Sequence, residues 1–199
     1  MKIVLASANA HKALELGRLL EGWEVETFDG ELPEETGDTF IANARLKAQH
    51  VHAALAGSEW VLADDSGIEA AALGGVPGVR SARYAGEDAT DQQNLAKLIG
   101  ALADEDDRRV RYVAELVAIA PDGAEVTARG ELTGTLVDTP RGTGGFGYDP
   151  AFLPDGETRT VAEMAAGEKD AISHRARAAR TLLPLLQQRG QTPMLHDET

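Results

Sequence analysis

Hydrophobic residues in the first third of the chain change their spacing twice. Residues 2–6 form a short apolar run, which is typical of a buried strand. After this run the spacing becomes helical, with hydrophobic side chains at Ala13, Leu16, Leu19 and Leu20. A second helical stripe follows a polar stretch at residues 34–37, and its members are Ile41, Ala44, Ala48, Val51 and Leu55. The pattern predicts strand, loop, helix, loop and helix.

The middle of the chain predicts a sheet that is not purely parallel. Residues 60–63 read as a strand that ends in the polar turn 64–67. Thr90 and Gln93 resemble a capping box in front of a helix. Residues 110–120 and 125–134 flank a Pro-Asp-Gly turn and predict an antiparallel hairpin. Together with the first strand and helix, this hairpin indicates a mixed α/β sheet.

The last third of the chain predicts one more long helix. Thr160 and Glu163 resemble a second capping box, and a hydrophobic stripe from Ala179 to Leu186 marks a final helix disturbed by Pro184. We expect residues 1–190 to form one bilobed domain and residues 191–199 to be a flexible tail.

Composition and charge limit the partners of this chain. The 199 residues are 43% hydrophobic, which is enough for one buried core, and the net charge of −14 would repel DNA, RNA or an anionic membrane. The chain has no cysteine, so any metal must be held by oxygen or imidazole. No 18-residue apolar run occurs. We therefore expect a cytoplasmic protein that binds small anions only where basic groups gather locally.

The segment 7–12 is the first candidate for such a site. Here a strand meets a helix N-terminus, where free backbone N–H groups favour phosphate. Its residues are Ser7, Ala8, Asn9, Ala10, His11 and Lys12. An equally good reading is that Ser7 or Asn9 caps the helix and that Lys12 is solvated.

Two adjacent carboxylates, Asp64 and Asp65, are the second candidate. One of them could bind Mg²⁺ while an oxygen remains free to orient or deprotonate water. A polar turn capped by Ser66 explains the same residues equally well. The acidic pair Glu34 and Glu35 favours the metal site, since Mg²⁺ prefers a few carboxylates together with substrate phosphates.

A glycine-rich loop and a basic cluster complete the set. Residues 142–150 place four glycines beside two aromatic rings, which suits a flat ligand, although a plain loop with core aromatics has the same composition. Lys169, His174 and Arg175 supply positive charge in an acidic chain. Arg177 and Arg180 are interpreted as a solvated helix face.

These segments, in this order, resemble the inosine triphosphate pyrophosphatase family, also called non-canonical purine NTP or dITP/XTP pyrophosphatases. The likeness covers nearly the whole chain. Its most specific stretches are residues 35–40, 63–67, 81–84, 144–150 and 172–175. In the phosphate loop Ala8 replaces the glycine that the family usually carries, so this loop is the place where affinity could differ.

The resemblance implies a role for each matching residue. Asp65 would be the catalytic acid-base and metal residue, and the second metal carboxylate would lie at Glu34 or Glu35, with Glu35 preferred. Ser66, Lys47 and Lys169 would contact the substrate. The base would be bound by Phe146, Gly147, Tyr148, Asp149, His174 and Arg175.

The resemblance also implies a fold and an activity. The fold would be a long, curved mixed sheet flanked by helices, in two lobes with the substrate cleft between them, assembled as a homodimer. The activity would be Mg²⁺-dependent hydrolysis of ITP, dITP and XTP to the monophosphate and pyrophosphate, which cleanses the nucleotide pool. Two rivals remain, a phosphatase that releases orthophosphate and a regulatory module that binds nucleotide without turnover.

Overall fold

A computed structural model describes residues 1–190, and the predicted flexible tail lies outside the described residues. Six strands form one sheet in the order β2-β1-β3-β4-β5-β6. Their bounds are β1 Lys2–Leu5, β2 Glu24–Thr27, β3 Trp60–Ala70, β4 Arg109–Ile119, β5 Glu125–Leu136 and β6 Phe152–Pro154. The strand β1 is parallel to both β2 and β3, whereas β3, β4, β5 and β6 are antiparallel neighbours. The predicted mixed sheet and its hairpin are therefore confirmed.

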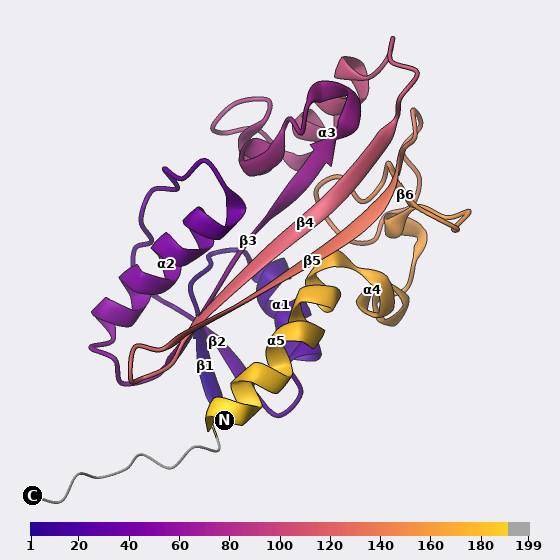
Figure 1. The fold of residues 1–199 in the computed structure, drawn as a ribbon. Helices are drawn as coiled ribbons and strands as arrows, with labels where there is room; N and C mark the ends of the chain where they lie inside the picture. Colours follow the sequence, from indigo (N-terminus) through magenta and orange to yellow (C-terminus); the bar gives the residue numbers. More distant parts are fainter. Residues whose placement is uncertain (191–199) are drawn as a thin grey trace, which may run out of the picture.

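Helices cover both faces of this sheet (Figure 1). Their bounds are α1 Ala10–Leu19, α2 Phe40–Ala54, α3 Asp91–Ala101, α4 Ala166–Ile172 and α5 His174–Gly190. On one face α2 packs against β3 and β4, and on the other face α5 packs against β4 and β5. Helix α5 also packs against α1, while α3 lies near the far ends of the long strands (Figure 1).

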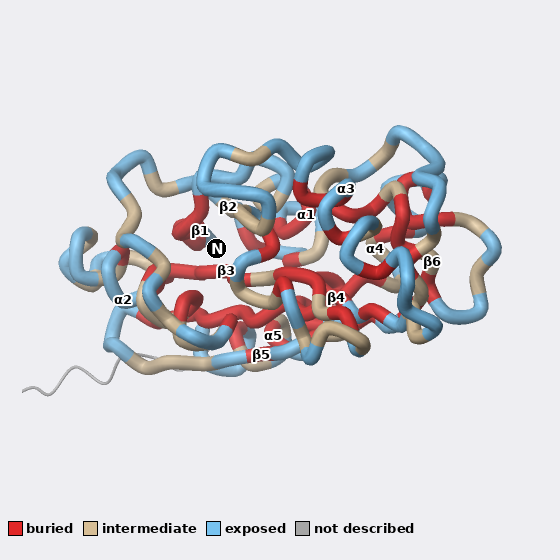
Figure 2. The backbone as a smooth tube through the Cα atoms, turned by 90° about the horizontal axis from the view of Figure 1, so that it is seen from above, coloured by how far each residue is buried: buried red, intermediate tan, exposed pale blue. Residues whose placement is uncertain are grey.

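Three apolar clusters divide the molecule into two lobes. One lobe holds two clusters on opposite faces of the sheet, the first around Leu16 and Leu182 and the second around Ala48 and Val61. The other lobe holds a cluster around Leu98 at the far ends of the long strands. Strands β3, β4 and β5 contribute to clusters in both lobes, and Figure 2 shows the exposed parts of the backbone around the outside of the buried strands. The three long strands thus connect the two groups of clusters.

The strand β3 differs from its prediction. We expected it to end at residue 63, but it continues through Asp64 and Asp65 to Ala70, paired with β4 along this stretch. Polar residues are tolerated inside the strand because each carboxylate has a cation nearby, Lys12 at Asp64 and Lys47 at Asp65. The alternative of a polar turn at residues 64–67 is therefore wrong.

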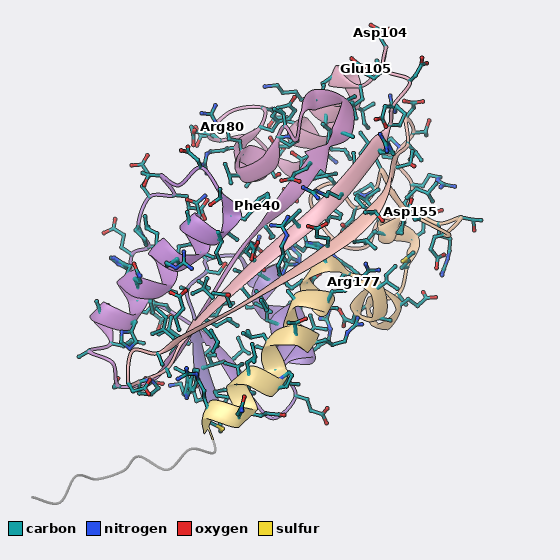
Figure 3. The ribbon with its side chains drawn as sticks, viewed as in Figure 1. Phe40, Arg80, Asp104, Glu105, Asp155 and Arg177 are labelled. Atoms are coloured by element: carbon teal, nitrogen blue, oxygen red, sulfur yellow. The ribbon has the colours of Figure 1, made fainter. Side chains whose placement is uncertain are left out.

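Two further expectations have simple outcomes. The capping box at Thr160 is present but begins only a short 3₁₀ turn, Val161–Glu163. Arg177 and Arg180 are exposed, as predicted; Arg177, labelled beside α5 in Figure 3, also donates to the Glu131 carbonyl of β5 at 2.9 Å. Within residues 1–190, no helix is both long and apolar enough to cross a membrane.

Candidate active site

A cavity of about 330 Å³ opens where β1 leaves β3. The pairing of β1 with β3 ends at Leu5 and Leu62. Beyond Leu62, the edge of β3 that β1 had covered faces the cavity. Most of the predicted site residues line it. They are Ser7, Ala8, Asn9, Lys12, Glu35, Lys47, Asp65, Ser66, Phe146, Gly147, Tyr148, Asp149, Lys169, His174 and Arg175.

Three predicted residues do not line this cavity. Ala10 is the first residue of α1, and Glu34 is exposed. His11 is also exposed, but its ring stacks on Phe146 with the two centroids 5.1 Å apart. The structure therefore brings Glu35, rather than Glu34, to the cavity.

The phosphate loop combines both readings of its sequence. Asn9 caps α1, since its side chain accepts hydrogen bonds from the backbone N–H groups of His11 at 2.9 Å and Lys12 at 3.2 Å. Lys12 is not a solvated residue, however. Its ammonium lies 2.5 Å from an Asp64 carboxylate oxygen, and its side chain is only 14% exposed. Ala8 has no positive φ, so its methyl group brings no backbone strain to the loop.

Asp64 and Asp65 face opposite sides of the sheet because successive strand residues alternate. Asp64 is fully buried beside Arg175, whose Nε donates to it at 2.9 Å. Burial alone would raise the pKa of Asp64, but the charges of Arg175 and Lys12 hold it well below its usual range. On the other side, burial raises the pKa of Asp65 to about 6, and Lys47 only partly opposes this.

Glu35 and Asp65 flank the ammonium of Lys47. The Lys47 Nζ atom lies 2.6 Å from Glu35 Oε1 and 3.7 Å from Asp65 Oδ1, and it also donates to the Asp64 carbonyl at 2.8 Å. Burial acts to raise the pKa of Glu35, but Lys47, Lys12 and Arg83 together outweigh it and the pKa is lowered. Two adjacent carboxylates on an open cavity fit Mg²⁺, which usually takes one or two carboxylates and completes its coordination with water and substrate phosphates.

The opposite wall of the cavity is built around Asp149. This carboxylate is 2% exposed and accepts hydrogen bonds from Lys169 at 2.8 Å, from the Tyr112 hydroxyl at 3.0 Å and from the Phe146 backbone N–H at 3.0 Å. The Lys169 ammonium also lies 4.8 Å from the centroid of the Phe146 ring. These contacts fix one aromatic face beside a cation, as a flat heterocycle requires. Tyr148 is more structural, because it is buried and donates to the Ser81 carbonyl at 2.7 Å.

His174 and Arg175 lie at the start of α5, behind Phe146. Arg175 is 1% exposed and bonds to Asp64, to the Ser66 hydroxyl at 2.8 Å and to the Glu15 carboxylate. His174 stacks on Tyr112, and burial holds its pKa well below its usual value, so its ring is neutral. Its Nδ1 atom has no hydrogen-bond partner among the described residues. A buried polar atom of this kind on a cavity wall points to a ligand.

The structure also adds residues that the sequence did not single out as site residues. Glu15 is 6% exposed and bridges Arg175 and Lys169, the latter at 2.7 Å. Arg83 donates to Glu35 at 3.4 Å. No local signal marks Glu15, because its partners lie more than a hundred residues away. Arg83 lies in residues 81–84, a stretch that carries the family resemblance, and this membership was the only sequence signal that Arg83 could belong to the site.

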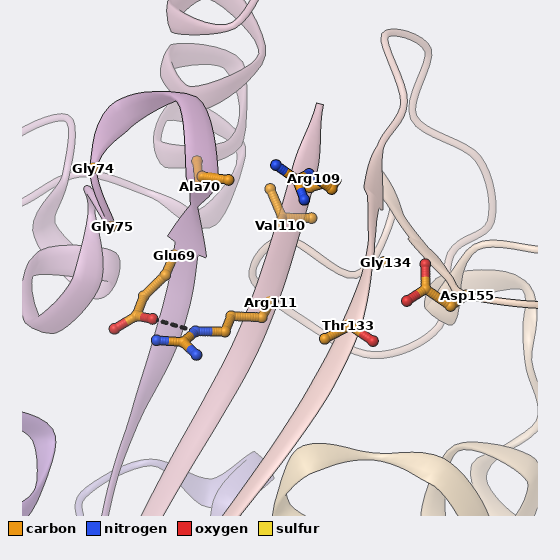
Figure 4. Close-up of a pocket in the computed structure, with 11 residues that line it drawn as sticks. Glu69, Ala70, Gly74, Gly75, Arg109, Val110, Arg111, Thr133, Gly134 and Asp155 are labelled. Atoms are coloured by element: carbon orange, nitrogen blue, oxygen red, sulfur yellow. Dashed lines mark hydrogen bonds and ion pairs between the residues drawn. The ribbon is translucent and has the colours of Figure 1, made fainter. Parts of the chain in front are cut away.

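A second, larger hollow of about 520 Å³ lies over the far ends of β3, β4 and β5 (Figure 4). Figure 4 shows Arg111 directed at Glu69, to which it donates at 2.6 Å. Its other arginine, Arg109, is paired with Asp107. None of the predicted site residues lines this hollow. The smaller cavity is therefore the candidate active site.

Comparisons with known proteins identify relatives of this chain. The model of the Ham1 family matches residues 3–185. A dITP/XTP pyrophosphatase of Deinococcus deserti is 47% identical over 91% of this chain and 87% of its own, and one of Shigella flexneri is 46% identical over 93% and 98%.

Solved structures extend the likeness to the fold. The Ham1 protein of Staphylococcus aureus superposes with a TM-score of 0.84 at 36% identity, covering 95% of this chain and all of that one. A Mycobacterium abscessus nucleoside-triphosphatase, also described as a dITP/XTP pyrophosphatase, has a TM-score of 0.74 at 41% identity over 92% of this chain. The chain thus belongs to the Ham1 family, as the resemblance in its motifs indicates.

Proposed function

We propose that this protein is a nucleoside-triphosphate pyrophosphatase that acts on ITP, dITP and XTP. One observation carries the proposal. A single cavity joins an acid-base and cation centre, made of Asp65, Glu35 and Lys47, to an aromatic wall that ends in His174, whose Nδ1 atom has no partner among residues 1–190. The two relatives from Deinococcus deserti and Shigella flexneri are dITP/XTP pyrophosphatases by name.

We propose that Mg²⁺ is the cofactor and that Glu35 and Asp65 hold it. The metal would neutralise part of the triphosphate charge and stabilise the developing charge on the leaving pyrophosphate. Lys12 and Lys47 reach the same end of the cavity and would supply further positive charge there. In the free protein both ammonium groups are paired with acidic groups, so substrate binding would exchange carboxylate partners for phosphate oxygens.

The catalytic step follows from the environment of Asp65. Its pKa of about 6 lets the carboxylate be ionised at neutral pH and yet accept a proton readily. It would orient and deprotonate a water molecule, which attacks the α-phosphorus and releases pyrophosphate. A module that only bound nucleotide would have no need of such a base.

The aromatic wall would select the base. Hypoxanthine and xanthine present an acceptor oxygen at C6, where adenine presents an N–H₂ donor, and Lys169 and Arg175 can only donate. Both cations are nearly buried, so facing adenine would cost one of them a partner without water to replace it. Phe146 would stack on the ring system.

Product analysis tests the proposed function. ³¹P NMR of a reaction with ITP and Mg²⁺ should show IMP and pyrophosphate, and EDTA should abolish turnover. Orthophosphate with IDP would identify the rival phosphatase. Binding of ITP without turnover would identify the regulatory module.

We also propose a cellular setting for the activity. The acidic, cysteine-free chain would act in the cytoplasm as a homodimer and remove abnormal purine triphosphates before polymerases use them. The homodimer rests on the family resemblance, and analytical ultracentrifugation at micromolar concentration should find twice the chain mass of 21.1 kDa.

A further inference from the structure

Asn43 is a buried amide that touches two parts of the candidate site. It lies in the first turn of α2 and has no exposed surface. Its Nδ2 atom donates to Asp65 Oδ2 at 3.2 Å, and its Oδ1 atom accepts from the backbone N–H of Gly37 at 2.7 Å. One side chain therefore links the carboxylate on β3 to the segment that carries Glu35.

The link is tight on the Gly37 side. A methyl group on Gly37 would lie 2.7 Å from Asn43 Oδ1 and 2.9 Å from the Ala42 side chain, closer than such atoms approach one another. Glycine at this position lets the backbone come close enough to bond with the amide. The distance between the loop and α2 is thus set by Asn43.

The start of α2 is itself fixed. Thr39 caps the helix through a hydrogen bond from the Ala42 N–H, and Lys47 follows Asn43 by one turn on the same buried face. Asn43 donates a hydrogen bond to Oδ2 of Asp65, and the Lys47 ammonium lies 3.7 Å from Oδ1. The helix therefore holds both oxygens of one carboxylate, one with a neutral donor and one with a cation.

We propose that Asn43 is a positioning residue that fixes the Asp65 carboxylate relative to the loop of Glu35, so that both carboxylates meet one divalent cation. The proposal rests on the proposed function, because it assumes the metal role of these two side chains. Groups that orient metal ligands typically change metal affinity or activity about 10- to 100-fold when they are removed. A merely structural buried amide would change stability alone.

The test compares Asn43→Ala with Val51→Ala. Val51 is fully buried on the same helix, packs in the cluster around Ala48 and Val61, and does not line the cavity. We expect Asn43→Ala to lower kcat and to weaken Mn²⁺ binding, measured by EPR without nucleotide, about 10- to 100-fold each, with KM for ITP changed less than about 3-fold. Val51→Ala should lower Tm and leave both quantities near the wild-type values.

Three outcomes would overturn the inference. They are an Asn43→Ala variant with wild-type kcat and Mn²⁺ affinity, a Val51→Ala variant with the same losses, and a wild-type protein that does not bind Mn²⁺ at all. If Asn43→Ala does not fold, Gly37→Ala disturbs the other end of the link and should weaken Mn²⁺ binding in the same direction. If the wild type binds Mn²⁺ but does not hydrolyse ITP, the proposed function fails. The Mn²⁺ affinities of Asn43→Ala and the wild type then still test whether Asn43 positions the metal ligands.

Discussion

Asp64 and Asp65 are adjacent, identical and nearly inaccessible to solvent, yet the structure gives them opposite properties. Asp64 lies on the α5 side of the sheet between Arg175 and Lys12, which keep its pKa well below the usual range. Asp65 lies on the α2 side, where burial raises its pKa to about 6. The first carboxylate is a permanent counterion, and the second is able to exchange a proton.

This difference shows how one strand can supply both structure and chemistry. Alternation along β3 sends neighbouring side chains into different environments, and the number of cations in each environment decides the role. Asp64 forms ion pairs with two cations, whereas the one ion pair of Asp65 within residues 1–190 is with Lys47, which it shares with Glu35. Single substitutions at the two positions should therefore have different effects.

The largest effect should be on stability, in Asp64→Asn. The variant leaves the buried Arg175 guanidinium with a weaker partner, and breaking a buried ion pair costs about 3–5 kcal/mol. Urea unfolding, followed by tryptophan fluorescence at pH 7, measures this loss of unfolding free energy. Because the folded pKa of Asp64 is depressed, the loss should be full above about pH 4, the unfolded pKa, and shrink below it. Asp170→Asn breaks the exposed pair with Arg18 and should cost at most about 1 kcal/mol; equal losses would refute the distinction.

Asp65→Asn should instead reduce catalysis. Loss of a general base lowers kcat at least about 100-fold, which corresponds to about 2.7 kcal/mol, while the fold persists. Steady-state assays with ITP measure it. The exposed neighbour of Glu35 provides a control, because Glu34→Gln should stay within about 2-fold of wild type whereas Glu35→Gln should not. An unchanged kcat in Asp65→Asn would exclude Asp65 as the base.

The same variant should be more stable than the wild type at neutral pH. Ionised Asp65 is buried at a cost, and a pKa raised from about 4 to about 6 corresponds to about 1–3 kcal/mol in favour of the neutral form. Asparagine removes that cost, so the unfolding free energy of Asp65→Asn should exceed that of the wild type above pH 6. The gap should close below about pH 4, where Asp65 is protonated in both the folded and the unfolded state. If the unfolding free energy of Asp65→Asn instead gains on that of the wild type as the pH falls, the pKa of Asp65 is lowered in the folded protein and not raised.

Arg175→Lys tests whether the α5 side of the site discriminates between ITP and ATP. Lysine keeps the charge beside Asp64 but loses the planar fork that also reaches Ser66 and Glu15. We expect the ratio of kcat/KM for ITP to kcat/KM for ATP to fall about 10-fold. This is the change that the loss of one hydrogen bond from a charged group would cause. Arg177→Lys, on the exposed face of α5, is the control. Equal proportional losses on both nucleotides would mean that Arg175 serves a feature that they share.

The smallest effect is expected at Ala8. Because its backbone needs no positive φ, glycine brings no relief of strain and adds only flexibility to the free loop, worth about 0.5–1 kcal/mol. Ala8→Gly should therefore raise KM for ITP no more than about 5-fold and leave kcat unchanged. A marked fall in KM would show that the methyl group obstructs the phosphates.

Much of the fold could be predicted from the sequence because it depends on local periodicity. The first strand, the helices at Leu16, Ala48 and Leu98, and the hairpin of β4 and β5 all follow hydrophobic spacing and turn residues. Two strands could not be found in this way. The edge strand β2 has no buried residue, and β6 has only three residues, so neither carries a periodic signal.

The sequence by itself determined the family, the mixed sheet and the set of residues that gather at one cavity, because motifs and periodicity are written in neighbouring positions. The tertiary structure decided what each charged group does. It extended β3 through Asp64 and Asp65, chose Glu35 over Glu34 for the cavity, and brought in Glu15 and Asn43. The physical reason is that burial and ion pairing depend on groups far apart along the chain, and these set the pKa of a carboxylate more strongly than its neighbours in sequence do.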